Sequence, residues 1–509
     1  MLSSIVSGGV LGVEAYRVFV EVDVARALPS FSVVGLPDGA VKESRDRVRA
    51  AIKNSGFAFP QYRVTVNLAP ADVKKEGAGF DLPMALAVLA ADPDSGFTAD
   101  PSVLVVGELS LDGAVRPVRG VLPLAVRALA DGLSGIMVPR ENVAEAAVVR
   151  GLEVYPADSL SQVVEGLKTK SLSPVRIDTG SLFKKASVHS EDFSEVRGQA
   201  HAKRALEIAA AGGHNMLMVG PPGSGKTMLA RRIPTILPSM TWEEAVETSR
   251  IYSVAGLLSG EMPLMAARPF RSPHHSVSDA GLIGGGANPR PGEATLAHNG
   301  VLFLDELPEF KRNILELLRQ PLEDGTVNIV RAVGAVTFPA RFMLVGAMNP
   351  CPCGYLGDEK RHCSCPPSAV ERYASRISGP LLDRFDIRVE VGAVKYREIA
   401  HEDGAEEPSS VIRERVERAR AVQAKRLAPH GIYRNAEMGA TLVRRMAKPE
   451  TSAGALLEHA MDRMGMSARA YSRTLKVART IADLDGRVEI KRTDVLEALS
   501  LRGASGARN

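Results

Sequence analysis

Residues 216–227, MLMVGPPGSGKT, constrain the fold of this chain more than any other stretch. The four apolar residues at its start have the length and continuity of a strand buried on both faces of a parallel sheet. The glycines that follow let backbone N–H groups turn inward toward an anion, and the helix that begins there adds its positive end. The spacing GxxxxGK(S/T) is complete. The stretch therefore predicts an α/β domain with a nucleotide phosphate site.

Each residue of this loop has an expected role in binding ATP. Lys226 is long enough to reach the β- and γ-phosphates, and the Thr227 hydroxyl is placed to ligate Mg²⁺. The predicted nucleotide-binding residues are Gly220, Pro221, Pro222, Gly223, Ser224, Gly225, Lys226, Thr227 and Met228. An ordinary glycine turn between a strand and a helix is the competing interpretation. The complete motif in its strand, loop and helix context favours the phosphate site.

Residues 301–306, VLFLDE, supply the acids that ATP hydrolysis requires. Four apolar residues followed by two carboxylates are typical of a buried strand that ends at the carboxyl edge of a parallel sheet. Asp305 is expected to hold the Mg²⁺ shell, and Glu306 to orient or deprotonate the attacking water. A solvated strand end would have the same composition, but the pairing with Lys226 favours a hydrolase.

The length of 509 residues exceeds what one hydrophobic core usually serves, so about three domains are expected. Hydrophobic residues make up 45% and charged residues 24%, and no apolar run reaches membrane-spanning length. The N-terminal residues lack a basic segment and include Glu14, which argues against a signal peptide. A cytoplasmic location without membrane contact is the expectation.

Positive charge is concentrated near the C-terminal end. Residues 411–509 contain 20 Lys and Arg against 11 Asp and Glu, whereas the whole chain has a net charge of only +4. A basic domain of this kind suits a polyanion. On charge alone, a solvated helical surface rich in arginine is an equal alternative.

The chain before residue 192 is expected to hold an α/β domain and a linker. Residues 1–168 contain alternating stretches such as VFVEVDV and YRVTVNL, which are typical of half-buried strands. The runs GFDLPMALAVLAA and VVGELSLDGAVRPVRGVLPLAVRALADG resemble the proteolytic domain of Lon-type proteases, which has the ribosomal S5 domain 2-like fold. Residues 169–191 are polar and aperiodic, and are predicted to be a linker.

The resemblance to Lon-type proteases also provides a test for proteolysis, because these enzymes use a Ser-Lys dyad. The matching motifs place Gly79 near the serine position and Leu122 at the lysine position. Neither residue can act as nucleophile or base, and Ser55, Lys74 and Lys75 lack the required spacing. The domain is therefore expected to be non-proteolytic and to bind a partner or help the assembly form.

Residues 192–395 are expected to form the ATPase core, which opens with a short loop and an alanine-rich helix. After the phosphate loop come an excursion at 270–300 rich in Gly, Pro, His and Asn, two strand-like runs about an RAVG turn, and a strand ending at Asn349. This order resembles the helix-2 insert, pre-sensor-1 hairpin and sensor-1 asparagine of the AAA+ clade that includes magnesium chelatase and MCM-type helicases. The opening loop cups the adenine in AAA+ ATPases, which implies contacts from Val196 and Gly198.

The same resemblance implies two arginines that contact the γ-phosphate. The element LLDRFD resembles the carrier of an arginine finger, so Arg384 would reach into a neighbouring subunit and stabilise charge on the transferring phosphoryl group. Residues 396–509 are expected to form a helical lid domain, in which SARAYSRTLKVARTIADL matches the sensor-2 helix. Arg469 is the expected γ-phosphate contact in cis, with Arg473 the less favoured choice. An ordinary surface arginine is the alternative for each.

All four cysteines lie close together with the spacing C-x-C-x9-C-x-C, at Cys351, Cys353, Cys363 and Cys365. Four thiolates suit a tetrahedral Zn²⁺ in softness and number, with His362 as a possible substitute ligand. The CxC pairs differ from the CxxC pairs of common zinc knuckles, so unmetallated thiols remain the alternative. A metal here would be structural, because four thiolates leave no coordination position open.

The order of these three domains closely resembles the YifB/ComM family of magnesium-chelatase-like ATPases. The resemblance implies an ATP-driven hexamer that acts on single-stranded or branched DNA, as a translocase or branch-migration helicase in recombination or natural transformation. An arginine finger independently requires a neighbouring subunit. The hairpin around Arg331 and the excursion residues Arg271, His274 and His275 are expected to line a pore through which DNA phosphates pass.

Three other functions stay open. An AAA+ remodeller of a protein complex would carry the same ATPase motifs, and only the basic C-terminal segment disfavours it. A magnesium chelatase subunit would leave the Lon-like domain unexplained, and a protease would need the dyad that the sequence lacks. Stimulation of ATP hydrolysis by DNA would separate a DNA motor from a remodeller.

Overall fold

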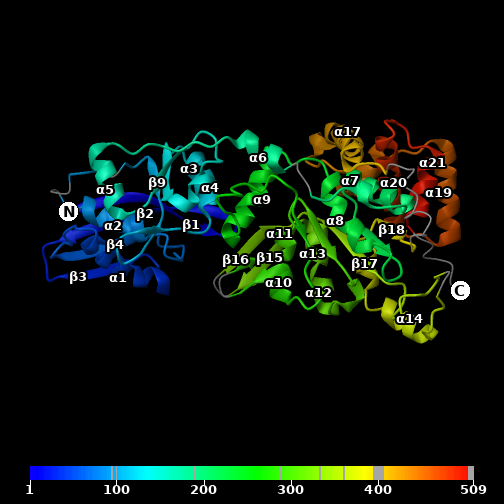
Figure 1. Cartoon of the computed structure of the whole chain (residues 1–509), viewed down its shortest axis with the longest axis horizontal. Helices are drawn as coiled ribbons and strands as arrows, with labels where there is room; N and C mark the ends of the chain where they lie inside the picture. The colour runs from blue at the N-terminus through cyan, green and yellow to red at the C-terminus, as the bar shows by residue number, and fades with distance from the viewer. Residues whose placement is uncertain are drawn as a thin grey trace. The chain divides into compact units, whose positions relative to one another are not determined.

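The computed structural model describes residues 1–92, 96–98, 100–186, 190–286, 289–331, 334–358, 361–393 and 406–502. The chain forms two compact units (Figure 1). One comprises Met1–Lys185 and Trp242–Ala266, and the other comprises Ala186–Thr241 and Ala267–Asn509. The segment Trp242–Ala266 lies within the residues predicted for the ATPase core, but it packs into the N-terminal unit.

The N-terminal unit is built on a four-stranded sheet with the order β1-β2-β4-β3. Its strands are β1 (Leu2–Leu11), β2 (Glu14–Ala25), β3 (Ser30–Val34) and β4 (Arg63–Ala69), and helices α1 (Gly39–Asn54) and α2 (Asp81–Ala90) pack with them. Strand β3 pairs with β4 in parallel, and the other pairs are antiparallel. Val18, Val20 and Val22 of β2 are buried at alternate positions, as predicted for a half-buried strand.

A second sheet in this unit is parallel and has the order β5-β8-β9. The remaining elements are β5 (Val103–Val105), β6 (Glu108–Leu109), β7 (Val115–Arg116), β8 (Gly135–Pro139), β9 (Glu153–Ala157), α3 (Val121–Ala130), α4 (Val143–Ala146), α5 (Leu160–Thr169) and α6 (Thr179–Ala186). Helix α6 lies inside the segment predicted to be an aperiodic linker. The ring of Phe183 on this helix lies 6.0 Å from the ring of Trp242, centre to centre. The predicted linker therefore contains a helix, and this helix contacts an aromatic residue that is distant in sequence.

Helix α9 (Trp242–Ala255) packs against α3 within the N-terminal unit. The backbone amide of Leu122 donates to the Ser253 hydroxyl at 3.3 Å and to the Glu145 carboxylate at 3.0 Å. The same carboxylate accepts a hydrogen bond from the Ser253 hydroxyl. Burial raises the pKa of Glu145, although these hydrogen bonds oppose the shift. Buried polar contacts therefore hold α9 within the N-terminal unit.

The second unit contains a sheet of five parallel strands in the order β11-β14-β17-β10-β18. They are β10 (Met216–Val219), β11 (Phe270–Arg271), β14 (Val301–Leu304), β17 (Met343–Met348) and β18 (Ile387–Glu390), and α7 (Ala200–Gly212) and α8 (Lys226–Ile236) pack with them. Because all five strands are parallel, their carboxyl ends meet at one edge of the sheet. The predicted α/β class with a parallel sheet is confirmed.

Short elements connect the strands of this sheet. They are α10 (Asp279–Ile283), β12 (Gly284–Gly285), β13 (Arg290–Pro291), α11 (Glu293–Leu296), α12 (Arg312–Leu317), α13 (Arg319–Asp324), β15 (Thr326–Arg331), β16 (Gly334–Pro339), α14 (Pro367–Ala374) and α15 (Gly379–Leu382). Strands β15 and β16 form the predicted antiparallel hairpin, in which Thr326 pairs with Pro339 and Arg331 with Gly334. The Arg331 side chain and residues 332–333 lie outside the described residues.

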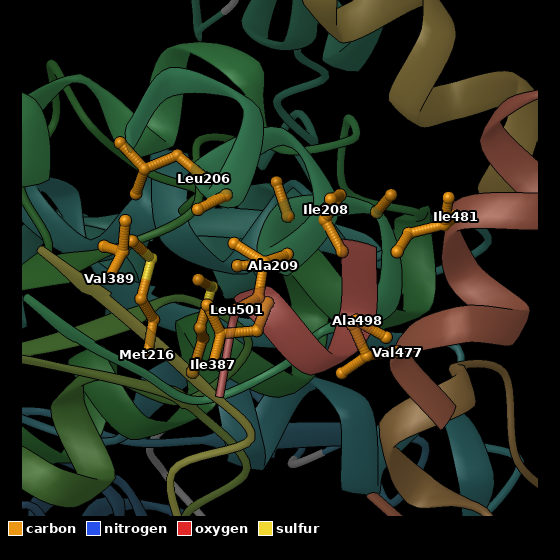
Figure 2. Packing of buried hydrophobic residues seen from close by; sticks show 14 of the residues in the cluster. Leu206, Ile208, Ala209, Met216, Ile387, Val389, Val477, Ile481, Ala498 and Leu501 are labelled. Carbon is orange, nitrogen blue, oxygen red and sulfur yellow. The ribbon is translucent and has the colours of Figure 1, made fainter. Parts of the chain in front are cut away.

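The C-terminal helices share one hydrophobic core with the sheet. They are α17 (Ser409–Leu427), α18 (Ala440–Met446), α19 (Thr451–Met464), α20 (Ala468–Leu484) and α21 (Arg492–Ser500). Figure 2 shows Val477 of α20 beside Ala498 of α21, and Leu501, which follows α21, beside Ala209 of α7 and Ile387 of β18. The C-terminal region is helical, as predicted, and it forms one unit with the sheet.

Within the described ranges, no helix is both long and apolar enough to cross a bilayer.

Candidate functional site

The phosphate loop follows β10 at the carboxyl edge of the sheet, and α8 begins directly after it at Lys226. Gly223 and Gly225 have φ angles of +75° and +88°, in the left-handed region that favours glycine. The Lys226 ammonium donates to two carbonyl oxygens of the loop at 2.7 and 2.9 Å. Burial lowers the pKa of Lys226, although the charge of Asp305 opposes the shift. A bound phosphate would add a negative charge that favours the ammonium form.

The predicted acid that follows β14 reaches the start of α8. The Thr227 hydroxyl donates to Oδ2 of Asp305 at 2.6 Å, and the backbone amide of Glu306 donates to Oδ1 at 2.9 Å. Hydroxyl and carboxylate oxygens are the hard donors that Mg²⁺ prefers. Thr227 and Asp305 therefore fit a magnesium ion, which when bound would polarise phosphoryl oxygens.

Glu306 and Asn349 complete the group of side chains at this edge. Glu306 has a left-handed φ of +50°, and its side chain is 60% exposed. Strand β17 lies between β14 and β10, so Asn349, which follows it, emerges between the two motifs. Its Oδ1 atom lies 3.3 Å from Nζ of Lys226. The structure therefore brings together five of the six side chains that the sequence predicts for ATP hydrolysis within one subunit, and the sixth, Arg469, lies elsewhere.

A cavity of about 250 Å³ adjoins the phosphate loop. Its lining residues are Glu195, Val196, Arg197, Gln199, Ser224, Gly225, Met228 and Leu229. Of the two predicted adenine contacts, Val196 lines the cavity, whereas Gly198 does not, and its amide donates to Oε1 of Glu406 at 2.9 Å. Sequence reasoning misses Gln199, whose side-chain amide donates to the Gly392 carbonyl at 2.5 Å. No spacing signal marks this glutamine, because its partner follows a distant strand.

Arg384 lies at the amino edge of the sheet, opposite the phosphate loop. Asn215 directly precedes β10, and its side-chain amide donates to the Arg384 carbonyl at 3.1 Å. The four residues of β10 separate Asn215 from the loop, which at about 3.3 Å each is about 13 Å. The Arg384 guanidinium pairs with Glu323 and donates to the Pro380 carbonyl at 2.7 Å. Arg384 is therefore directed away from the nucleotide site of its own subunit.

Arg469 lies near Arg384 and not near Lys226. Both arginines line a cavity of about 720 Å³, and none of its lining residues within the described chain belongs to the phosphate loop. The cationic side chains that line it are Arg341, Arg384, Arg434, Arg469, Arg473 and Lys476. Burial and the charges of neighbouring arginines lower the pKa of Arg384. This placement departs from the γ-phosphate contact in cis expected for Arg469, because α20 packs at the amino edge of the sheet.

The four cysteines form one cluster, in which all four sulfur atoms lie within 4.8 Å of one another. The backbone amide of Cys353 donates to the sulfur of Cys365 at 3.3 Å, and that of Cys365 donates to the sulfur of Cys363 at 3.4 Å. In a tetrahedral site, Zn–S bonds of about 2.3 Å place the sulfurs about 3.8 Å apart. The cluster therefore fits a soft divalent cation. Among the described residues, the cluster consists of the four cysteines. His362, the possible substitute ligand, does not belong to it.

The four residues predicted to line a DNA pore have different surroundings. The Arg271 guanidinium makes two hydrogen bonds to the Glu293 carboxylate, at 2.6 and 2.7 Å. The rings of His274 and His275 lie 4.0 Å apart, centre to centre. The side chain of Arg331 lies outside the described residues. Arg271 is therefore engaged within the chain, and a DNA contact by any of the four stays a prediction.

The positions that match the Ser-Lys dyad of Lon-type proteases hold no nucleophile or base. Gly79 has no side chain, and Leu122 is buried. The Lys75 ammonium donates to the Pro70 carbonyl, and burial lowers its pKa. A non-proteolytic role for this domain stays a prediction.

Known proteins match the chain along nearly its whole length. The family model for magnesium chelatase subunit ChlI matches residues 192–399, a second model for subunit ChlI matches 20–142, and the ChlI C-terminal model matches 406–502. The chain is 43% identical to competence protein ComM of Haemophilus influenzae over 509 residues, 98% of this chain and 97% of that protein. It is 44% identical to the uncharacterised protein YifB of Escherichia coli over 503 residues, with coverage of 98% and 97%. The chain belongs to the YifB/ComM family of magnesium-chelatase-like AAA+ ATPases.

Membership of the YifB/ComM family agrees with the fold of both units. The chain is also 23% identical to a Lon protease of Azospirillum brasilense over 147 residues, 26% of this chain and 18% of that protein. The predicted fold is confirmed: a Lon-like domain, an AAA+ core on a parallel sheet and a helical C-terminal region. In this YifB/ComM protein, the side chains that the sequence predicts for the phosphates and Mg²⁺ of ATP lie together at the carboxyl edge of the sheet.

Proposed function

We propose that this protein is a DNA-stimulated ATPase that works as a hexameric translocase or branch-migration helicase. One observation carries the proposal. The hydrolytic side chains lie at the carboxyl edge of the sheet, whereas Arg384 and Arg469 line a cationic cavity at the amino edge. A subunit in this arrangement needs the arginines of a neighbour to complete its site.

The reaction follows from the positions of the side chains. Lys226 holds the β- and γ-phosphates of ATP, and Thr227 and Asp305 would hold a Mg²⁺ ion, which when bound would neutralise charge on the phosphoryl oxygens. Glu306 takes the proton of the attacking water, whose oxygen forms the new bond to the γ-phosphorus as the bond to ADP breaks. Asn349, hydrogen-bonded to Lys226, orients the γ-phosphate.

The neighbouring subunit supplies the remaining positive charge. We assign this role to Arg384 and also to Arg469, which the sequence motif alone would place in cis. Both stabilise the charge that spreads over the transferring phosphoryl group. In a closed ring, each subunit supplies its arginines to the nucleotide site of one neighbour and receives arginines from the other neighbour. This is the basis for proposing a hexamer.

Two observations support DNA as the partner. Residues 411–509 carry 20 Lys and Arg against 11 Asp and Glu, and a relative of nearly full coverage is named a competence protein. We therefore propose a cytoplasmic protein that acts on single-stranded or branched DNA in recombination or natural transformation.

The first experiment measures ATP hydrolysis with and without single-stranded and forked DNA. We expect stimulation by DNA that falls as salt is raised, because phosphate contacts release counterions. The Lys226→Ala variant serves as the blank, since it removes the phosphate-binding ammonium. A rate indifferent to every DNA would overturn the DNA motor and favour the second candidate, an AAA+ remodeller of a protein complex.

The DNA contacts are tested separately. We propose that Arg331, at the tip of the β15–β16 hairpin, contacts DNA phosphates, together with Arg271, His274 and His275 of the excursion. Arg331→Ala is expected to weaken DNA binding and to leave DNA-free ATP hydrolysis unchanged. Arg45→Ala, which removes the same charge from an exposed pair in the N-terminal unit, is the matched control. Equal DNA affinity of the two variants would remove Arg331 from the interface.

We also propose that the four-cysteine cluster binds structural Zn²⁺. Its sulfurs have the number and spacing of a closed tetrahedral site. Elemental analysis of protein purified without added metal should find one zinc per chain. Cys353→Ser should lower that content, and Ser364→Ala, between two ligands, should leave it unchanged. The site would be excluded if the wild-type protein were purified without metal and did not take up added Zn²⁺.

A further inference from the structure

The loop that carries the cysteines touches the phosphate loop directly. Gly354 lies between Cys353 and Tyr355 with a φ of +87°. A β-carbon placed on Gly354 would lie 2.5 Å from Cδ and 2.7 Å from Cγ of Pro222, the third residue of the phosphate loop. Separations this short are impossible without movement. The backbone of the cysteine loop therefore packs against the proline ring, at a position where only glycine fits.

A second contact joins the same two loops. Asn349 precedes the cysteines by two residues, and its Oδ1 atom lies 3.3 Å from Nζ of Lys226. Pro222 and Lys226 are thus both touched by the segment that starts at the end of β17. Any change in the conformation of the cysteine loop is transmitted to the phosphate loop at two points.

The cysteines determine whether this loop can hold its shape. Cys351 is buried, and its sulfur lies 3.4 Å from that of Cys353 and 3.5 Å from that of Cys363. The cluster joins the segment before Gly354 to the segment that returns at Cys365. A metal bonded to all four sulfurs would close this loop by strong bonds and fix Gly354 in place. Without the cation, the loop would keep only hydrogen bonds such as that from the Gly354 amide to the Cys351 carbonyl at 3.0 Å, and weak contacts between sulfurs.

We propose that metal bound by the four cysteines controls nucleotide affinity, by holding Gly354 against Pro222 and so keeping the phosphate loop in its binding conformation. This inference rests on the proposed metal and nucleotide sites. When the loop loses its cation, the phosphate loop samples other conformations. The apparent dissociation constant for nucleotide then rises in inverse proportion to the binding-competent fraction that remains.

Two glycines of the loop allow a matched test. Gly354 and Gly357 have similar left-handed φ angles, +87° and +82°, so a methyl group causes similar backbone strain at both. A β-carbon on Gly357 has no heavy atom within 4 Å, whereas one on Gly354 meets Pro222. Only Gly354→Ala should push on the phosphate loop, and neither variant removes a sulfur.

The first measurement is the affinity of both variants for a fluorescent ADP, with metal content and unfolding temperature measured in parallel. We expect Gly354→Ala to keep its metal and to bind ADP about tenfold more weakly, because the proline must move by a substantial fraction of an ångström. Gly357→Ala should match the wild type in both properties. Wild-type affinity in Gly354→Ala, or equal weakening in both variants, would overturn the contact as the cause.

The second measurement removes the metal from the wild-type chain. ADP binding is measured without Mg²⁺ before chelation, after chelation, and after Zn²⁺ is returned, with Lys226→Ala as the protein that lacks nucleotide binding. We expect affinity to fall on chelation and to recover with Zn²⁺. If the chain binds zinc but its affinity for ADP does not change when the zinc is removed, the control mechanism is overturned and the metal site stands. Tight ADP binding by a chain that takes up no Zn²⁺ would overturn the metal site and leave the nucleotide site standing.

Discussion

The Nδ1 atom of His275 lies 3.7 Å from the Oε2 atom of Glu306. The ring of His275 contacts two other rings, that of His274 at 4.0 Å and that of Phe310, in an edge-on arrangement, at 6.4 Å between ring centres. Phe310 closes the short turn that follows Glu306. His275 therefore belongs to the surroundings of the proposed catalytic base, although sequence motifs suggest that it contacts DNA.

His275 is predicted to position Glu306 for catalysis. A base must lie within hydrogen-bond reach of the water that it deprotonates, and an exposed carboxylate without a partner samples other rotamers. His275→Ala should therefore lower kcat about tenfold with little change in KM, as measured by steady-state ATP hydrolysis without DNA. His275→Asn keeps a polar group and should retain part of the rate. An unchanged kcat combined with weaker DNA binding would show that the histidine serves the DNA and not the base.

Glu306 itself is predicted to be needed for hydrolysis and not for binding. Glu306→Gln keeps the shape of the side chain and removes its basicity, so kcat should fall by about a hundredfold or more. The dissociation constant for ATP should stay within about threefold of the wild-type value, because Lys226 and Thr227 remain. Equilibrium binding and single-turnover hydrolysis measure the two effects. Loss of both together would assign Glu306 a structural role.

Arg384 and Arg469 are both predicted to act on the nucleotide of a neighbouring subunit. Each variant, Arg384→Ala or Arg469→Ala, should be inactive alone and should regain ATP hydrolysis when mixed with Lys226→Ala. In mixed rings, an intact phosphate loop from one subunit meets an intact arginine from the other. The rate of mixed samples over a range of ratios is the measurement. If Arg469→Ala fails to complement while Arg384→Ala succeeds, Arg469 acts in cis as its motif suggests.

Asp386 is predicted to stabilise the packing of the C-terminal helices on the sheet. Its carboxylate lies 3.3 Å from Nδ1 of the buried His214 and 3.5 Å from Nε of Arg473. Burial acts to raise the pKa of Asp386, but the hydrogen bond from His214 and the charges of His214, Arg473 and Lys476 outweigh it and lower the pKa. The stabilisation is therefore present above the ordinary aspartate pKa of about 4 and is lost as pH falls through the lowered value.

Asp386→Asn should destabilise the second unit by about 3 kcal/mol at neutral pH, because it leaves buried positive groups without their partner. Thermal unfolding at several pH values measures the effect, and the difference from the wild type should shrink in acid. Asp46→Asn removes a carboxylate that is 75% exposed, and should change the unfolding temperature little. Similar effects of the two substitutions would contradict a stabilising role for the buried carboxylate.

Local sequence patterns are sufficient to predict the carboxyl-edge site. The strand and loop of residues 216–227 and the acids after β14 lie together because parallel strands present their carboxyl ends at one edge. Hydrophobic periodicity likewise predicts the hairpin β15–β16 and helix α20, which begins after its N-cap residue, Ser467. In each of these cases the information lies within a few residues of chain. The four cysteines belong to the same class, since two CxC pairs need only a short loop to meet.

The sequence by itself therefore determined the family, the fold class and the chemistry expected at one edge of the sheet. Only the tertiary structure decided that Arg469 lies with Arg384, that Trp242–Ala266 packs into the N-terminal unit, and that Gly354 rests on Pro222. These contacts join residues whose spacing along the chain contains no signal, because they depend on how helices and loops pack across a shared core. Strand polarity and short-range motifs follow local rules, whereas the side of the sheet on which a distant helix settles depends on the packing of the whole unit.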